Sequence, residues 1–477
     1  MKRALLLFIF FSSLLTIPAR LHVGDPYTWR EEARALILYQ RLDVPPAAAQ
    51  SHGEPDQFFV KNVRNDRYFS KYGVMNGLLN TVPLWFEYKI HHSLPEWDSA
   101  YRRLYLGLFS VLISVLIAWL LFRIASRYTE SPGLAALYTL LCVFATYLHY
   151  YLRASNTEAT QVLFFCAYFE SVLLFRDSGF KKSRYFLLSW VFVLCLALTK
   201  ISFLLLVPLA ILPGLAREDR FRLRAILETL LPCLAIAGII ALVNFHRFGS
   251  PFHTGYTWAK DDLSNTLPAW RIIPNLFFNE QWGLLSHFPL LLLVPFGARR
   301  FYRERRLDFW FLLLIALAFF FSIGRLPIWK GEWGYGPRYF LFALPVLCLP
   351  ALPALEWMLS GLRRKSAPAL AASVTAMLVF GYSSMLQLQV ARLDPFFYYW
   401  VRPPVVCDKN EDVKTYFAKT HFGRFNAEFW AHRDSFESLW WLEEVRKNCP
   451  REIFVDYRKN LETWIQRTNF YWFSPRD

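Results

Sequence analysis

Eleven apolar runs constrain this chain more than any other feature of its sequence. They lie near residues 4–20, 104–124, 132–150, 157–176, 185–198, 201–216, 225–244, 283–298, 308–324, 337–357 and 367–388. Most have the roughly 17–25 residues that a helix needs to cross the hydrocarbon core of a bilayer. The runs 185–198, 201–216 and 283–298 are short, which indicates tilted, broken or re-entrant helices. The sequence therefore predicts an all-α polytopic membrane protein with about eleven transmembrane helices.

The basic residues of the short connections indicate an orientation. Every second connection is rich in arginine and lysine, as in the segments 123–127, 176–184, 217–224, 299–306 and 363–365. Basic residues of short loops stay on the cytoplasmic side. The amino terminus is therefore predicted inside and the carboxyl terminus outside. The first run is interpreted as an uncleaved anchor, because no clear small-x-small cleavage site follows it.

Three outward segments are long, at 21–103, 245–282 and 389–477. Residues 1–390 are predicted to form one transmembrane module, in which 21–103 is a partly ordered loop with a helix-like end. Residues 391–477 are predicted to form a small α+β cap outside the cytosol, with a helix near 434–447 and a strand near 452–456. The absence of any Asn-x-Ser/Thr sequon in these segments favours a bacterial source and its inner membrane.

The seven cysteines divide between apolar runs and the outward tail. Five of them are interpreted as core residues: Cys142, Cys166, Cys195, Cys233 and Cys348. Cys407 and Cys449 fall in the tail, where disulfides persist, so a bridge between them is a hypothesis. The chain has no CxxC pair, no HExxH and no histidine cluster with metal-ligand spacing, so no structural metal site is predicted.

Two acidic residues at outward helix ends are candidates for catalysis. Asp25 lies just after the first apolar run and ahead of an amphipathic segment, where it is either a general base or simply the cap of a helix. Glu158 opens the helix after the outward connection 151–156. It is either a second active-site acid or a carboxylate placed by the helix dipole.

Four basic residues on the same side are candidates for binding an anion. Lys71 precedes Tyr72 and is either a phosphate ligand or part of a basic loop at the lipid headgroups. Lys200 stands alone where two short helices meet, as a snorkelling side chain or a phosphate ligand. Arg247 ends another apolar run, ahead of Tyr256. Arg338 follows Gly336-Pro337 at the predicted start of a transmembrane helix, where a guanidinium and free N–H groups suit a phosphate.

These strings resemble bacterial GT-C glycosyltransferases, in particular the dolichyl-phosphate-mannose-protein mannosyltransferase and aminoarabinose transferase group. The resemblance covers residues 1–390 and depends on the order of four strings: Gly24-Asp25 with Ala33-Arg34-Ala35-Leu36, Ser70-Lys71-Tyr72-Gly73 with Leu78-Leu79 and Pro83, Arg247-Phe248-Gly249-Ser250-Pro251 with Gly255-Tyr256, and Gly336-Pro337-Arg338-Tyr339. It implies transfer of a sugar from a polyprenyl-phosphate-linked donor to a lipid, glycan or protein acceptor at the outer face of the membrane. Membrane lipids are the other expected partners, and no nucleic acid is expected.

The resemblance also implies roles for individual residues. The acid of the first outer loop is the catalytic base in such enzymes, and Asp25 matches it, with Glu31 and Glu32 as alternatives; Glu158 is similar to the acid of the second outer loop. The cations that would balance the departing phosphate are Lys71, Lys200, Arg247 and Arg338. The aromatic residues expected to bind substrate are Tyr72, Tyr256, Trp333 and Tyr339. Inversion at the sugar carbon is expected, with no obligatory cofactor and with a divalent cation, Mg²⁺ or Mn²⁺, as an open alternative.

Two other functions remain as alternatives. A transporter or flippase of lipid-linked glycans would use the same lipids, but the apolar runs show no evident two-fold repeat and no charge in mid-span. A membrane scaffold that presents the outward tail would leave Lys200 and Arg338 without a role. The sequence therefore favours a glycosyltransferase.

Overall fold

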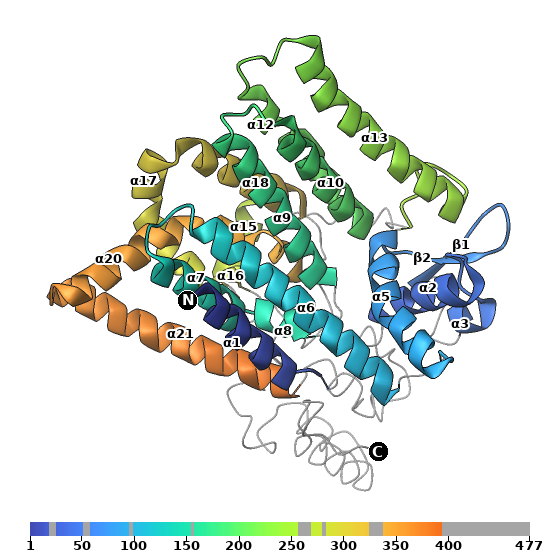
Figure 1. The fold of residues 1–477 in the computed structure, drawn as a ribbon, viewed down its shortest axis with the longest axis horizontal. Helices are drawn as coiled ribbons and strands as arrows, with labels where there is room; N and C mark the ends of the chain where they lie inside the picture. The colour runs from blue at the N-terminus through green and yellow to red at the C-terminus, as the bar shows by residue number, and fades with distance from the viewer. Residues whose placement is uncertain are drawn as a thin grey trace, which may run out of the picture.

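The computed structural model describes residues 1–18, 25–50, 58–94, 99–153, 157–255, 269–278, 283–323 and 337–393. The predicted α+β cap, Cys407 and Cys449 lie outside the described residues, as do Tyr256 and Trp333. The described part of the chain is a bundle of helices with one short hairpin (Figure 1).

Each predicted apolar run contains at least one helix. Five segments are long and apolar enough to cross a membrane: α6 (Ala100–Ala125), α9 (Thr157–Asp177), α13 (Leu223–Phe248), Leu344–Arg363 and Ala367–Leu388, within α21 (Ala367–Leu393). The other runs contain α1 (Lys2–Leu15), α7 (Pro132–Phe144), α8 (Leu148–Arg153), α10 (Ser183–Thr199) and α18 (Arg306–Ile323). The number of crossings, about eleven, stays a prediction.

Three of the runs are broken into short pieces. The first consists of η1 (Ile201–Leu205), α11 (Leu206–Ala210) and α12 (Leu212–Leu215), and the second of α16 (Leu284–His287), η2 (Pro289–Leu293) and α17 (Val294–Glu304). The third is η3 (Arg338–Phe340), α19 (Leu344–Leu347), η4 (Leu349–Ala351) and α20 (Leu352–Arg363). Breaks in the first two were expected; the run predicted over 337–357 begins with the separate turn η3, and its span-length helical stretch is Leu344–Arg363. Pro345, Pro350 and Pro353 each remove a backbone donor there, which shortens the helical pieces.

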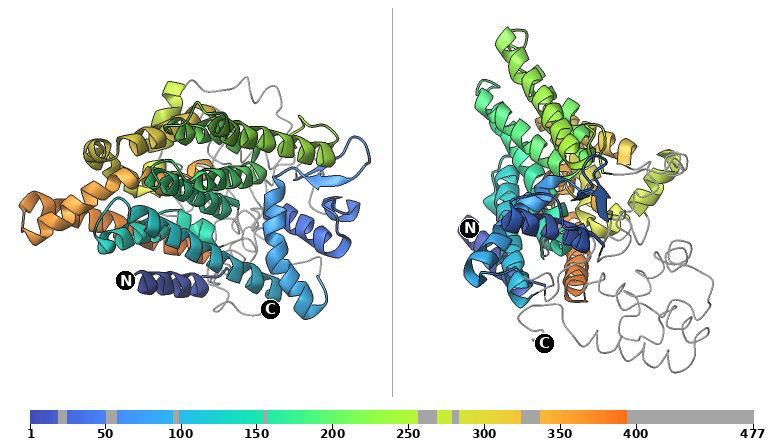
Figure 2. Two further views of the ribbon diagram at one scale, coloured as in Figure 1. Left: turned by 45° about the horizontal axis from the view of Figure 1, so that its top comes forward. Right: turned by 90° about the vertical axis from the view of Figure 1, so that its right-hand side faces the viewer.

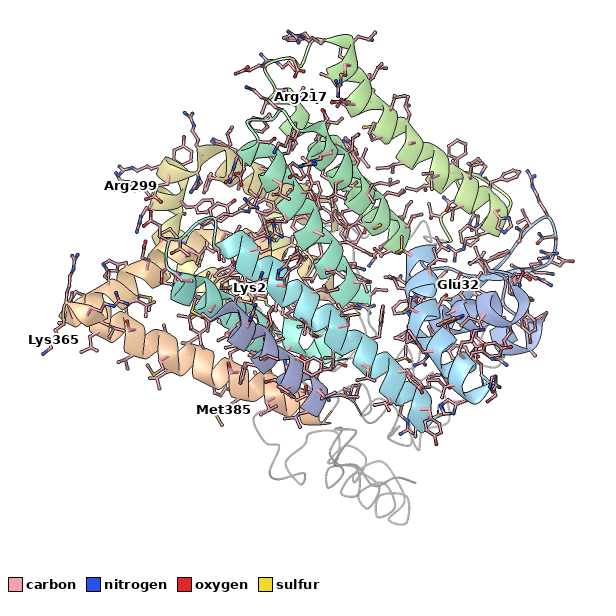
Figure 3. The ribbon with its side chains drawn as sticks, viewed as in Figure 1. Lys2, Glu32, Arg217, Arg299, Lys365 and Met385 are labelled. Atoms are coloured by element: carbon pink, nitrogen blue, oxygen red, sulfur yellow. The ribbon has the colours of Figure 1, made fainter. Side chains whose placement is uncertain are left out.

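The basic connections gather at one end of the bundle. Arg217, Arg299 and Lys365 lie away from Glu32, which belongs to the opposite end (Figure 3). We call the first the basic end and the second, which carries β1 (Phe59–Lys61) and β2 (Tyr68–Ser70), the hairpin end. At the basic end, Glu170 binds Arg123 at 2.7 Å and Arg127 at 2.8 Å and so joins α9 to α6.

The hairpin end is built from the segment after α1, seen beside the ends of the bundle helices in Figure 2. It contains α2 (Asp25–Tyr39), α3 (Pro46–Gln50), the antiparallel pair β1–β2 and α5 (Val74–His91). Helices α2 and α5 pack together around Ala33 and Leu84, which are buried. Glu87 binds Arg102 at 3.1 Å, with both side chains buried, and fixes α5 on α6. This segment is more ordered than the loop predicted from sequence.

Candidate functional site

A buried ion pair joins the hairpin end to the end of α13. Nη2 of Arg247 donates to Oε1 of Glu32 at 2.8 Å and to the carbonyl oxygen of Ser70 at 2.5 Å. The side chains are 3% and 0% exposed. The side chain of Asn62 donates to the carbonyl oxygen of Arg247 at 3.0 Å, so the hairpin also caps the end of this helix. The two charges are paired and hydrogen-bonded, which is the condition for keeping them inside a protein.

Lys71 lies next to this pair along the chain. Its Nζ is 5.3 Å from the centre of the Tyr72 ring and 5.6 Å from that of Phe58. Tyr72 in turn packs edge-on against Trp29 of α2, with ring centres 5.9 Å apart. Gly255 has φ +81, and a Cβ there would lie 2.6 Å from the carbonyl oxygen of Lys71, so only glycine fits. The chain after α13 therefore closes over the Lys71 backbone.

Gly73 brings the same segment to the end of α10. A Cβ on Gly73 would lie 2.1 Å from the carbonyl oxygen of Leu198 and 2.4 Å from that of Thr199. Nδ2 of Asn76 donates to the Thr199 carbonyl at 3.2 Å. Because Lys200 follows Thr199 directly, these contacts place the backbones of Lys71 and Lys200 near each other. This is why a glycine is needed at position 73.

Replacing Gly73 with alanine should therefore disturb the junction of α5 and α10. The added methyl group must displace backbone, which costs about 1–3 kcal/mol in a packed interior. We expect a lower melting temperature in detergent for Gly73→Ala. Gly238→Ala is the matched control, because a Cβ at Gly238 in α13 meets nothing within 4 Å. An equal melting temperature for both variants would show that the close approach at Gly73 is relaxed in solution.

Lys200 connects this region to the remaining candidates. Its Nζ lies 3.4 Å from the centre of the Tyr339 ring, and the guanidinium carbon of Arg338 lies 5.4 Å from the same ring. Nη1 of Arg338 is 3.6 Å from Oε1 of Glu158, whose other oxygen accepts from the Thr157 hydroxyl at 3.1 Å. Two cations from distant segments therefore share one tyrosine ring, beside one buried carboxylate.

The structure differs from expectation around Arg338. The sequence predicts this arginine at the start of a transmembrane helix, with several free N–H groups. Arg338 instead opens η3, a single three-residue turn that begins after Pro337. The Tyr147 hydroxyl donates to the Pro337 carbonyl at 3.2 Å and holds this turn against the bundle. Positive charge at this point comes from the guanidinium rather than from a helix terminus.

The three candidates for the catalytic base in the first outer loop, Asp25, Glu31 and Glu32, have different surroundings. Glu31 turns to Arg34, with Oε2 at 3.3 Å from Nη1, and burial raises its pKa. Burial also raises the pKa of Glu32 to about 7, against the opposing effect of Arg247. Asp25 is the first residue of α2, and its side chain lies outside the described atoms. Glu158 lies in the first turn of α9, as predicted.

Sequence reasoning missed three residues of this region. Ser70, Trp29 and Asn76 contact Arg247, Tyr72 and Thr199, respectively. Four buried polar atoms without a hydrogen-bond partner among the described residues also come from here: Trp29 Nε1, Glu32 Oε2, Asn76 Oδ1 and Arg247 Nε. Such atoms are rare in native proteins and invite a functional reading. Ser70 and Trp29 stand in strings noted from the sequence, but nothing in the pattern marked a role for either of them or for Asn76.

Two carboxylates of this region face arginine side chains rather than other carboxylates. No group of three or more His, Cys, Asp or Glu side chains with metal-binding geometry exists within the described residues. Glu32 and Glu158 instead face guanidinium groups, which take the place of a cation beside them.

Comparison with known proteins supports the fold. No protein-family model matches the sequence, and no curated protein matches it in sequence. Among solved structures, the chain is similar to the archaeal oligosaccharyltransferase AglB from Archaeoglobus fulgidus in complex with an inhibitory peptide and a dolichol-phosphate. The TM-score is 0.50 at 12% identity, over 81% of this chain and 55% of that one. The chain thus spans about half the length of the oligosaccharyltransferase structures that it matches.

A bacterial structure is also similar. ArnT from Cupriavidus metallidurans bound to undecaprenyl phosphate gives a TM-score of 0.46 at 14% identity, over 97% of this chain and 75% of that one. The likeness to AglB, at a TM-score of 0.50, shows that the chain shares the GT-C fold of that protein, at low sequence identity. The five described segments that are long and apolar enough to cross a membrane agree with a multi-pass membrane protein.

Proposed function

We propose that the protein transfers a sugar from a polyprenyl-phosphate-linked donor to an acceptor at the membrane surface on the hairpin end. The observation that carries this proposal is the meeting of Lys200 and Arg338 on the Tyr339 ring, with the Lys71 segment packed beside Lys200 through Gly73. Fixed cations at the end of a helix bundle suit a lipid phosphate, whose charge must stay at the membrane surface. The GT-C fold agrees with this chemistry.

The reaction needs a base on one side of the sugar carbon and cations on the other. In the proposed step, the Asp25 carboxylate takes the proton of the acceptor hydroxyl or amine, and the acceptor atom forms a bond to the anomeric carbon. The bond from that carbon to the phosphate oxygen breaks, and its electron pair leaves with polyprenyl phosphate. Attack opposite the leaving group inverts the carbon. Lys71, Lys200 and Arg338 stabilise the charge on the leaving phosphate.

The ion pairs support this division of roles. Glu31 and Glu32 are each held by an arginine, and Glu32 is fully buried, which favours Asp25 as the base. Arg247 is occupied by Glu32 and Ser70, so we propose that it positions the Lys71 segment rather than binding phosphate as its main task. Tyr72 and Tyr339 would contact the sugar or the isoprenoid next to the phosphate.

The direct test is release of polyprenyl phosphate by the purified full-length chain in lipid nanodiscs. Polyprenyl-phosphate sugars of several kinds are supplied with a mixed lipid and peptide acceptor pool, and products are followed by mass spectrometry. The proposal requires release with at least one donor. Movement of an intact donor between leaflets without release would instead favour the flippase alternative.

Arg338→Ala should weaken donor binding about ten- to hundredfold, since a hydrogen bond to a charged group contributes about 1.5–3 kcal/mol. Binding is measured by titrating donor into nanodiscs and following protein fluorescence. Arg338→Lys should recover part of the affinity because it restores the charge. Arg363→Ala, at the exposed basic end of α20, is the control and should bind donor normally. Unchanged affinity in Arg338→Ala would remove this residue from the phosphate site.

A further inference from the structure

A groove between α10 and α13 lies away from the candidate site, near the basic end. Its volume is about 600 Å³, and its surface is almost entirely apolar. The residues that line it are Leu187 of α10 and, from the first half of α13, Leu223, Arg224, Leu227, Glu228, Leu231, Pro232 and Ala235. Figure 1 shows α13 beside α10 at the edge of the bundle.

The groove is open because α13 is held mainly at its two ends. At the basic end, Arg217 binds Glu228 of α13 and donates to Ser183 of α10 at 3.5 Å. At the hairpin end, Arg247 binds Glu32. Of the most apolar 18-residue stretch of α13, only 11% is buried inside the protein, against 83% for the corresponding stretch of α9. The middle of α13 therefore leaves apolar surface that another apolar group must cover in the bilayer.

The excess of basic residues around the opening of the groove indicates a lipid ligand with an anionic headgroup. Segments 181–184 and 217–228 together carry seven basic residues and three acidic ones. The Arg217–Ser183 hydrogen bond keeps these two segments together. Glu228 is already bound by Arg217 and by Arg224, whose side chain is 80% exposed. Basic pockets between membrane helices on the side with positive loops bind anionic lipid headgroups.

We propose that this groove binds one acyl chain of an anionic phospholipid, with the lipid phosphate at Arg224. The position of the groove favours a bulk phospholipid over the polyprenyl substrate. Leu231 and Arg247 are 16 residues apart on one helix, which separates them by about 24 Å. A lipid whose phosphate binds at the hairpin end would have its headgroup at the opposite end of the bundle from this groove. The proposal is independent of the proposed enzymatic activity.

The test compares lipid retention by native mass spectrometry. Purified protein is incubated with phosphatidylglycerol, phosphatidylcholine or polyprenyl phosphate in detergent, and bound lipids are counted. Leu227→Trp fills the groove, whereas Leu234→Trp changes a more exposed residue of the same helix outside it. We expect wild-type protein and Leu234→Trp to retain one tightly bound phosphatidylglycerol, and Leu227→Trp to lose it.

A second pair of variants keeps the proposal testable if Leu227→Trp fails to fold. Arg224→Ala should weaken phosphatidylglycerol retention about fivefold, from the loss of one basic residue at the membrane surface, and Arg363→Ala should not. Equal retention of phosphatidylcholine would overturn the headgroup assignment. Retention that survives Leu227→Trp, or a preference of the groove for polyprenyl phosphate, would overturn the proposal as a whole.

Discussion

Asp25→Asn should abolish sugar transfer while leaving binding of the polyprenyl-phosphate sugar largely intact. Asparagine has the size of aspartate but cannot take a proton, and a general base typically contributes 10²–10⁴-fold to a rate. Asp25 opens α2, and the next turn of this helix contacts the Lys71 segment. Thr28 is 3.2 Å from the Ser70 hydroxyl, and Trp29 packs on Tyr72. Helix α2 therefore brings its first residue near the proposed phosphate ligands.

The measurement is initial transfer rate against donor concentration, with donor binding measured separately. Asp66→Asn is the control, because Asp66 belongs to the same outer segment but is 86% exposed in a surface pair with Lys61. Full activity in Asp25→Asn would refute its role as the base. Glu31→Gln and Glu32→Gln would then be compared for loss of rate at unchanged donor affinity.

Glu32→Ala should cost about 3–5 kcal/mol of stability, since removal of one partner leaves a buried charge uncompensated. The partner here is Arg247, 3% exposed. Thermal unfolding in detergent checks this loss. Arg300→Ala is the control: Arg300 and Glu304 are 52% and 51% exposed, and such surface pairs contribute about 0–1 kcal/mol. A loss for Glu32→Ala no larger than that of the control would contradict the importance of the buried pair.

A double variant separates stability from positioning. Glu32→Ala with Arg247→Met replaces the pair by apolar side chains, which is often neutral for stability. We expect it to recover much of the lost melting temperature. Donor affinity should stay reduced, because the hydrogen bond from Arg247 to the Ser70 carbonyl beside Lys71 is gone. Recovery of both properties would show that the pair only stabilises the fold.

The same pair predicts a dependence of stability on pH. Burial raises the pKa of Glu32 from its ordinary 4.5 to about 7, so the folded protein binds this proton more tightly than the unfolded chain does. Proton binding by Glu32 therefore stabilises the folded protein fully below about pH 4.5, and this proton-linked stabilisation is lost as the pH rises to about 7, where the ion pair with Arg247 takes its place. Glu32→Gln, which cannot titrate, should lack this change. Parallel pH curves for wild type and Glu32→Gln would contradict the raised pKa.

Much of the fold followed from sequence because hydrophobicity and loop charge are local signals. Each apolar run contains a helix, and the basic connections meet at one end of the bundle. The division of the run predicted over 337–357 into short helical pieces was not foreseen, because the run was judged by its length and not by its prolines. The helices and hairpin of the first outer segment were also underestimated, since their order depends on contacts with α6 and α13 that periodicity does not reveal.

Prediction of the candidate site from the sequence has a similar limit. The sequence grouped Lys71, Lys200, Arg247 and Arg338 on one side of the bundle, and the structure links their segments through Gly73, Tyr339 and Ser70. The partners of these residues were beyond prediction. Glu32 and Arg247 are 215 positions apart, and no local pattern states which acid an arginine will meet. Their pairing is one reason why Asp25 rather than Glu32 is proposed as the base.

The distance along the chain between Glu32 and Arg247 has a consequence for biosynthesis. Ribosomes add roughly 5–20 residues per second, so Glu32 is made about 10–40 s before the arginine that pairs with it. During that interval the segment carrying α2 and the hairpin lacks the anchor supplied by α13. Until then it is held only by contacts made earlier in the chain, such as that of Glu87 with Arg102. Truncated chains that end before residue 247 should therefore be recognised by quality-control proteases through this partly anchored segment.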